Sequence, residues 1–260
     1  MSDTKIIAKL RLDIAHFTAI GDRLSNQDTL DYASEDDLSC FVLADGTGGH
    51  EGGEIAANLV TTGILEKFKQ EASFSARALN SYIDWAIIQV AKKQQQNKTL
   101  GDMSTTVATV LIDQHNRCAL WAHLGDTRIY LFRAGKTQII SKDHSMAQSM
   151  VDAGIADYGQ IRLHPQRSVL FAAIGAQGET VPDVTSEALP LQDGDAFFLC
   201  TDGYWEWLQD HEMEQSLMNT QSSSEWLGKM NAVAQQNIGA LCVNRDNFSA
   251  FAIRIHDVIE

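Results

Sequence analysis

The hydrophobic positions of the chain follow two different periods, which divide it into short strands and longer helices. Apolar runs separated by short polar turns predict strands at residues 105–112, 118–124, 128–132 and 137–140. Because these runs follow one another so closely, we expect them to form one antiparallel meander. Further strands are expected at residues 6–17, 181–188, 196–200 and 248–255.

Helical spacing is clearest in the first half of the chain. Ile55, Leu59, Ile64 and Phe68 predict a helix over residues 53–70, and a second helix is expected at 75–93. Shorter helices are predicted at residues 146–153, 205–208, 213–218 and 224–236, with a cap for the last one at 222–224. Strands in hairpins beside internal helices predict an α+β fold whose helices cover the sheet faces.

No linker divides the chain, so we expect residues 1–260 to form a single domain. The three prolines all lie between Pro165 and Pro190, and no Gly/Ser-rich or Pro-rich stretch separates two halves. Residues 155–168 have no clear period, which predicts an exposed flap at about 145–170.

The net charge of −14 argues against nucleic acid or an anionic membrane as a partner, because both require a basic surface. It does suit a cation site. The N-terminus does not have the pattern of a signal peptide, and no apolar run approaches the roughly 18 residues of a membrane span. We therefore expect a soluble, cytoplasmic protein. Its cysteines are widely spaced and are expected to be reduced core residues: Cys40, Cys118, Cys200 and Cys242.

Two strongly apolar runs each end on an Asp-Gly pair. The run at residues 41–44 leads to Asp45 and Gly46, and the run at 196–201 leads to Asp202 and Gly203. Asp246 similarly stands close to the apolar strand at 248–255. A single Asp-Gly is usually an ordinary turn, but a carboxylate beside a core must be hydrogen-bonded or bound to a cation. The repetition therefore suggests that these acids meet at one site.

Carboxylates without nearby histidine or cysteine ligands select hard cations, which favours Mg²⁺ or Mn²⁺ over Zn²⁺. Three or four acids repel one another unless metal is present, and two ions sharing a carboxylate are a common arrangement for hydrolysis at phosphorus. The polar loop at residues 21–28 then acquires a role. Arg23 is a candidate ligand for phosphate oxygens, and Asp28 for a metal-bound water.

Several motifs, in the same order along the chain, resemble the metal-dependent protein phosphatases of type 2C, the PPM family, in their compact bacterial form. The resemblance rests on Arg23-Leu24-Ser25-Asn26-Gln27-Asp28, Val42-Leu43-Ala44-Asp45-Gly46, Met103-Ser104-Thr105-Thr106, Gly125-Asp126-Thr127-Arg128, Asp143-His144-Ser145, Ala173-Ile174-Gly175, Cys200-Thr201-Asp202-Gly203 and Arg245-Asp246-Asn247. It runs nearly from end to end of the chain.

The resemblance implies an antiparallel β-sandwich flanked by helices on both sides, with the acids at one end. Two Mn²⁺ or Mg²⁺ ions would be bound by Asp45, Gly46, Asp202 and Asp246, with Asp28 reaching a metal-bound water. A bridging hydroxide would attack phosphoserine or phosphothreonine, and Arg23 would orient the phosphate. The motif around Asp126 would be largely structural. The implied partners are phosphorylated proteins, a Ser/Thr kinase or its targets, with type VI secretion control as one setting, and the chain is expected to be a monomer.

The chain departs from the family pattern at three places. Gln27 replaces a common glutamate, which predicts modestly weaker metal affinity without loss of activity. Thr47 follows Asp-Gly where animal relatives have a histidine proposed as general acid, so metal-bound water would protonate the leaving group here, and His50 is expected to be structural or on the surface. Asp102 is the candidate ligand for a third ion. Two other functions stay open: a catalytically silent module that binds a phosphorylated partner, and a hydrolase of small phosphomonoesters.

Overall fold

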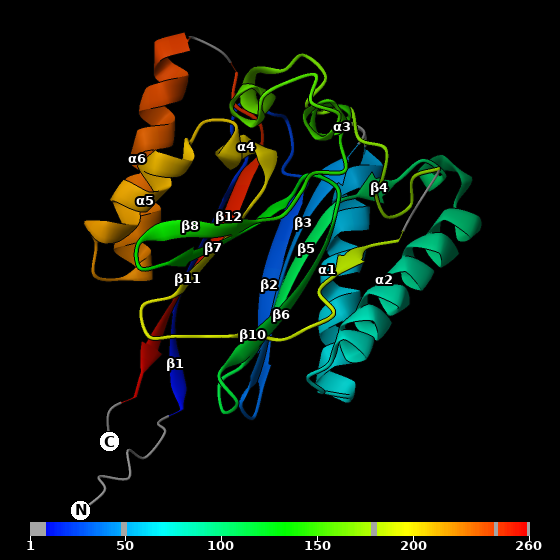
Figure 1. Ribbon diagram of the computed structural model, residues 1–260. Coiled ribbons are helices and arrows are strands. Elements are labelled where there is room, and N and C mark those ends of the chain that lie inside the picture. The colour runs from blue at the N-terminus through cyan, green and yellow to red at the C-terminus, as the bar shows by residue number, and fades with distance from the viewer. Residues whose placement is uncertain (1–8, 48–50, 178–180, 242–243, 259–260) are drawn as a thin grey trace, which may run out of the picture.

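The computed structural model describes residues 9–47, 51–177, 181–241 and 244–258, and its strands form two antiparallel sheets (Figure 1). The first sheet has the order β1 (Leu10–Ala19), β12 (Phe248–Asp257), β11 (Ala196–Cys200), β7 (Arg128–Arg133), β8 (Lys136–Ile140). The second has the order β10 (Leu189–Pro190), β6 (Cys118–Leu124), β5 (Val107–Asp113), β3 (Leu38–Thr47), β2 (Asp28–Glu35), with β9 (Asp183–Val184) beside β6 and β4 (Ser104–Thr105) beside β3.

Helices cover both outer faces, which gives the four layers that were expected (Figure 1). Helices α1 (Glu51–Gln70) and α2 (Ala76–Gln96) pack on the second sheet, while α5 (Asp210–Met218) and α6 (Ser223–Leu241) pack on the first. Shorter helices complete the set: η1 (Lys98–Leu100), α3 (Met146–Asp152), η2 (Tyr158–Leu163) and α4 (Asp202–Trp205). Among the described residues, no helix has the length and apolar content needed to cross a bilayer.

The apolar runs are continuous because both faces of the central strands are buried. On β3, Phe41 and Leu43 lie between the two sheets, whereas Val42 and Ala44 face α1 and α2. The inter-sheet core also holds Phe251, whose ring lies 5.6 Å from that of Phe41. Each fully buried side chain of this size contributes about 1.5–3 kcal/mol. This core holds the two sheets in a fixed relation, and with them the loops at their ends.

The strands between residues 104 and 140 correct one prediction. They form two hairpins in different sheets rather than one meander, because the chain crosses from β6 to β7 at Gly125. Gly125 has φ +100°, and a Cβ there would lie 2.5 Å from the side chain of Thr106. A residue other than glycine would therefore be strained at this crossover.

Several boundaries also differ from the predictions. Strands β2 and β10 were not predicted, and the strand expected at 181–188 is reduced to the two residues of β9. The helix expected at 205–208 lies earlier, as α4 at 202–205. The segment 155–168 is less exposed than expected, since η2 buries Ile161 and Arg162. The expected helices at 53–70, 75–93, 146–153, 213–218 and 224–236 are confirmed within a few residues. Cys40 and Cys200 are buried free thiols and Cys118 is half-buried, whereas Cys242 lies outside the described residues.

Candidate active site

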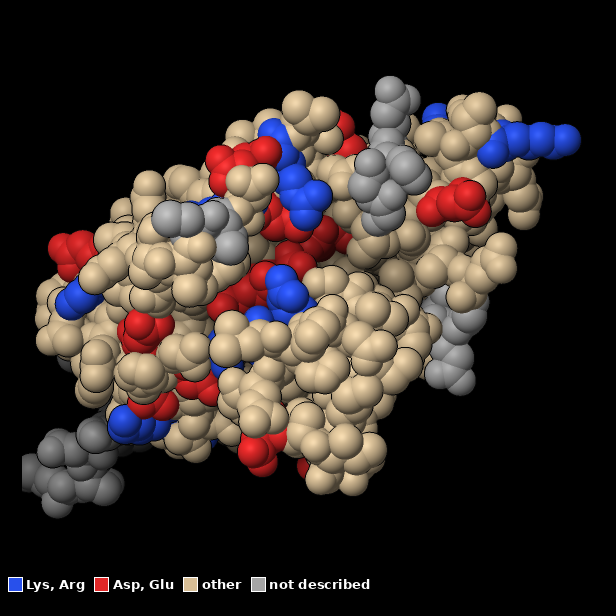
Figure 2. Space-filling view, turned by 90° about the horizontal axis from the view of Figure 1, so that it is seen from above, with Lys and Arg blue, Asp and Glu red and all other residues tan. Residues whose placement is uncertain are grey.

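A cleft of about 400 Å³ opens at the end of the sandwich where β3 and β11 end and β12 begins. Figure 2 looks onto this end and shows acidic side chains gathered along a groove, with basic side chains at its edges. The lining includes Arg23 and five acids, Asp22, Asp45, Asp126, Asp202 and Asp246. The three acids that follow or precede the apolar strands therefore do meet in one place.

Asp45 lies inside a strand, whereas its Asp-Gly sequence had suggested a turn. Strand β3 continues to Thr47, and Asp45 is paired across β2 with Asp28. The Asp45 carbonyl accepts hydrogen bonds from the Thr106 N–H and the Thr105 hydroxyl, both at 2.8 Å. These bonds fix the backbone that carries the carboxylate.

Gly46 is required by close packing. A Cβ at this position would lie 2.4 Å from the backbone carbonyl of Gly53, so a side chain would push β3 away from the start of α1. The Gly46 N–H donates to the Gln27 carbonyl at 3.1 Å, which ties the strand to the loop before β2. Gly48, Gly49 and His50 lie outside the described residues.

Asp28 is the first residue of β2 and is only 7% exposed. The Thr201 hydroxyl donates to its Oδ2 at 3.0 Å, whereas its buried Oδ1 has no hydrogen-bond partner among the described residues. A buried carboxylate oxygen without a partner is costly, and a cation or an ordered water normally satisfies it. Asp28 therefore keeps one buried carboxylate oxygen without a partner among the described residues, on the strand position paired with Asp45.

Asp246 and Arg23 meet on the opposite side of this acid group. The Arg23 Nη2 donates to Asp246 Oδ2, so the guanidinium neutralises one acid of the cleft. Both side chains are partly exposed, at 58% for Arg23 and 37% for Asp246. Arg23 is thus within reach of solvent at the entrance of the cleft.

The acids of the cleft raise one another's pKa values. Burial raises the pKa of Asp28 to about 7. Burial, and then the charges of Asp28 and Asp202, raises the pKa of Asp45 well above its usual range. Burial and the charges of Asp126 and Glu206 do the same to Asp202. The site is therefore a concentration of negative charge that Arg23 alone does not balance, which is the electrostatic condition for binding cations.

Residues 18–241 match the family model described as Protein phosphatase 2C. The chain belongs to the protein phosphatase 2C family. It is therefore a phosphoprotein phosphatase, and the resemblance inferred from the motifs is confirmed.

Two relatives of this phosphatase 2C chain are bacterial serine/threonine phosphatases. It is 32% identical over 196 residues to the serine/threonine protein phosphatase PstP of Mycobacterium tuberculosis, which covers 75% of this chain and 36% of PstP. It is 26% identical over 225 residues to the serine/threonine phosphatase Stp of Listeria monocytogenes, covering 83% of this chain and 88% of Stp.

Solved structures show the same fold. A PstP crystal structure is 26% identical and superposes with a TM-score of 0.80, covering 94% of this chain and 99% of that chain. Another PstP structure, of the catalytic domain in complex with two manganese ions, is 24% identical with a TM-score of 0.80 and covers 95% and 100%. PppA, described as a key regulatory component of T6SS in Pseudomonas aeruginosa, is 24% identical with a TM-score of 0.76, covering 96% and 99%.

Sequence reasoning missed the acid at position 126, which it read as part of a structural motif. Asp126 lines the cleft of this phosphatase 2C chain and is 4% exposed, and burial followed by the charge of Asp143 raises its pKa to about 7. A signal was available, because Gly125 and Asp126 follow the apolar run of β6 just as Asp45 and Asp202 follow the apolar runs at 41–44 and 196–201.

Position 102 is placed differently. Asp102 is exposed and is not among the residues that line the cleft. As a third-ion ligand it stays a prediction, without support from its position.

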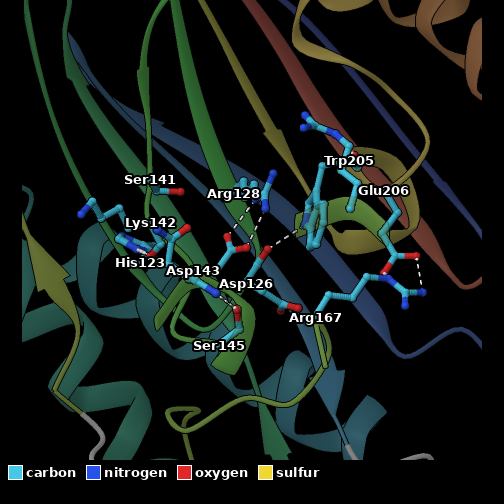
Figure 3. Close-up of polar contacts among 12 residues, drawn as sticks. His123, Asp126, Arg128, Ser141, Lys142, Asp143, Ser145, Arg167, Trp205 and Glu206 are labelled. Carbon is cyan, nitrogen blue, oxygen red and sulfur yellow. Dashed lines mark hydrogen bonds and ion pairs between the residues drawn. The ribbon is translucent and has the colours of Figure 1, made fainter. Parts of the chain in front are cut away.

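Glu206 and Arg167 form a second feature that the sequence did not reveal. Arg167, in the segment after η2, bonds both carboxylate oxygens of Glu206 just beyond α4 (Figure 3). The charge of Glu206 acts on Asp202, and the charges of Asp202 and Asp126 act on Arg167. The ion pair thus fastens the segment 145–170 beside the acids.

His123, His144 and Asp183 form a separate cluster with ligand atoms within 4.8 Å of one another. The hydrogen bonds argue against a metal there. The Gly125 N–H donates to His144 Nδ1 at 3.0 Å, so the proton of a neutral His144 is on Nε2, which lies 3.4 Å from Asp183 Oδ2. His144 Nε2 is consequently a donor and not a free ligand.

Proposed function

We propose that the chain is a serine/threonine protein phosphatase that works with two Mn²⁺ or Mg²⁺ ions. The observation that carries this proposal is the convergence of Asp45, Asp202 and Asp246 from β3, α4 and the loop before β12 into one cleft, with Arg23 at its entrance. Each acid comes from a distant part of the chain. Nothing in the fold alone requires three carboxylates to meet at a half-buried place, where they repel one another.

The donor set fits two hard cations. All the candidate ligands are oxygens: the carboxylates of Asp45, Asp202 and Asp246, and the Gly46 carbonyl, with Asp28 acting through water. Among the described residues, the only three histidine, cysteine or acid ligands within 4.8 Å of one another are those of the His123 cluster. The cleft acids are therefore spread more widely than one ion needs, which supports sharing them between two. The two manganese ions of PstP support the same arrangement.

A third ion would have a better ligand in Asp126 than in Asp102. Asp126 lines the cleft, and its charge is the largest acidic influence on Asp202. Asp102 is exposed and outside it.

Bound at these residues, two divalent cations would act as Lewis acids on the phosphate and supply an activated water for hydrolysis. The chain's own contribution is to place the phosphate. Arg23 bonds Asp246 in this structure, and a cation on Asp246 would replace that interaction and leave the guanidinium fork for two phosphate oxygens. The Thr47 hydroxyl, at the position where animal relatives have a histidine, shares a hydrogen bond with the Ser104 hydroxyl at 2.7 Å.

The proposal is tested with the purified protein and a phosphothreonine peptide. We expect hydrolysis with Mn²⁺, loss of activity in EDTA, and a loss of at least about 10³-fold in turnover for Asp202→Asn. Asp84→Asn removes an exposed acid on α2 and should leave turnover unchanged. Absence of hydrolysis by the wild-type protein in saturating Mn²⁺ would contradict the proposal. Tight peptide binding without hydrolysis would instead favour a silent binding module, and faster hydrolysis of small monoesters than of peptides would favour the small-substrate enzyme.

The proposal extends to opposing a Ser/Thr kinase, with type VI secretion control as its narrowest form. The resemblance of the fold to PppA does not carry that role to this chain at 24% identity. Comparing phosphorylated proteins between cells with and without the gene would decide it, since the targets of the paired kinase should gain phosphate when the gene is deleted.

A further inference from the structure

Leu24 is the most exposed large apolar side chain among the described residues, and it lines the cleft. Its relative exposed area is 104%, while its neighbour Arg23 is the proposed phosphate ligand. Single exposed leucines are common on protein surfaces and by themselves need no explanation. Leu24 differs because it stands at the entrance of the cleft next to the residue that would hold the phosphate.

The turn that carries Leu24 is held in place by both backbone and side-chain hydrogen bonds. The Asp22 N–H donates to the Arg245 carbonyl at 2.9 Å, and the Arg245 N–H donates to Asp22 Oδ2 at 2.8 Å. The Asn247 amide donates to the carbonyls of Ile20 and Ser25 at 2.8 and 2.9 Å. The backbone on both sides of Leu24 is therefore held beside the cleft by hydrogen bonds within the protein, before any ligand binds.

A second leucine lines the same cleft from another segment. Leu170 lies in the stretch after η2 and forms an isolated antiparallel bridge with Ser145. The stretch is secured on both sides of Leu170, because the Met146 N–H donates to the Val169 carbonyl at 2.9 Å and the Phe171 N–H donates to the His144 carbonyl at 3.0 Å. We refer to Leu24 and Leu170 together as the apolar rim.

The apolar rim and the acids of the cleft suit different parts of a substrate. The acids and Arg23 suit cations and a phosphate group, which every phosphomonoester offers. An apolar side chain at the same opening is of use only to a substrate that continues beyond the phosphate. In a phosphoprotein, the parts nearest to the phosphate are the side chains that flank the phosphorylated residue in sequence.

We propose that the apolar rim binds an apolar side chain next to the phosphorylated residue, so that the preferred substrates are phosphoprotein segments with apolar flanks. This inference rests on the proposed phosphatase function and adds a substrate class to it. Covering Leu24 with an apolar side chain removes apolar surface of both from water, which favours such substrates over those with polar flanks. Leu24 then acts as a specificity-determining residue.

The test compares two phosphothreonine peptides that differ only at the residues flanking the phosphothreonine, which are leucines in one and serines in the other. Leu24→Ser should lower kcat/KM for the leucine-flanked peptide by about fivefold to tenfold and change the serine-flanked peptide by less than about twofold. Hydrolysis of free phosphothreonine, which has no flanking residues, should not change, and Leu24→Met should keep the preference.

Leu163→Ser is the matched control, because Leu163 is 77% exposed but does not line the cleft. It should leave both peptides unchanged. Equal losses on the two peptides, or no loss on either, would overturn the inference while leaving the phosphatase function intact. Failure of the wild-type protein to hydrolyse any of the three substrates in Mn²⁺ would instead be a failure of the proposed function. A Leu24→Ser change in oligomeric state without a change in peptide preference would assign the rim to contact between copies.

Discussion

Two groups of buried charges lie side by side at the end of the sandwich: the Arg128–Asp143 ion pair and the acids of the cleft. The first is neutralised by its own ion pair, and the second is not. Arg128, whose side chain is 1% exposed, donates from Nε and Nη2 to the two carboxylate oxygens of Asp143 at 2.8 and 2.6 Å (Figure 3). Its guanidinium also lies 3.7 Å from the centre of the Trp205 ring. Asp126, only two residues earlier, lines the cleft and forms no ion pair among the described residues, although the charge of Asp143 raises its pKa and that of Arg128 lowers it.

The difference separates charge that serves the fold from charge that serves the site. The bidentate Arg128–Asp143 pair satisfies itself within the protein, and it joins β7 to the loop before α3. In the described part of the chain no ion pair joins a cation to Asp126, Asp45 or Asp202, although the charge of Arg128 lowers the pKa of Asp126. Arg23 and Arg167 pair with Asp246 and Glu206 instead. We therefore expect removal of the Asp143 charge to lower the free energy of unfolding, and removal of the Asp126 charge to raise it.

The largest effect is expected from breaking the self-contained pair. Asp143→Ala leaves Arg128 buried without its partner, which should lower the free energy of unfolding by about 3–5 kcal/mol in urea denaturation. Adding Arg128→Leu should recover part of the loss, because the stranded charge is then removed. Asp152→Ala breaks the exposed Lys142–Asp152 pair and should cost less than about 1 kcal/mol. Equal costs for the buried and the exposed pair would refute the distinction.

Removing an acid from the cleft should do the reverse. In EDTA, Asp126→Asn should raise the free energy of unfolding by about 1 kcal/mol or more at pH 8, because it removes a buried charge that neighbouring acids repel. With Mn²⁺ at about 100 times its dissociation constant, the wild-type protein should gain about 2.7 kcal/mol, and the advantage of the variant should shrink. The measurement is a pair of denaturation curves with and without metal. A destabilised variant in EDTA would show that Asp126 is a structural residue after all.

The layers of this fold could be predicted from the sequence because a strand that is buried on both faces is apolar at every position. The run at 41–44 alternates between the inter-sheet core and the helices, so every position is apolar. The same logic found Asp45 and Asp202, since an acid at the end of such a run is conspicuous. Strand β2 was missed because it lies at the edge of its sheet and keeps polar residues such as Asp31 and Ser34 along much of its length.

Which sheet each hairpin joins could not be read from local patterns. Strands β6 and β7 have similar apolar sequences, and only the packing of Gly125 against Thr106 shows that the chain changes sheets between them. That crossover is also what brings Asp126 to the cleft. The place of Asp126 in the cleft was therefore missed for the same reason as the two separate hairpins: a contact between distant parts of the chain determines both.

His123 is a buried titratable group that, among the described residues, has neither an ion pair nor a place in the cleft, and it gives the smallest expected change in stability. His123 is 5% exposed and is kept neutral: burial lowers its pKa, and the nearby ring of His144 lowers it further, against the opposing effects of the Lys142 carbonyl, Asp183 and Asp143. Below about pH 6.5 the unfolded chain takes up a proton that the folded chain resists, so this histidine reduces stability as the pH falls. His123→Gln should therefore flatten the acid side of the stability curve by up to about 1 kcal/mol at pH 5.5 relative to the wild type. His115→Gln is the control, because His115 is exposed. The variants are compared with the wild type because the raised pKa values of the cleft acids increase stability as the pH falls, and they do so equally in all of these proteins. Parallel curves for His123→Gln and the wild type would mean that the folded protein binds the proton on His123 as readily as the unfolded chain does. The pH dependence of stability would then come from other groups, such as the acids of the cleft.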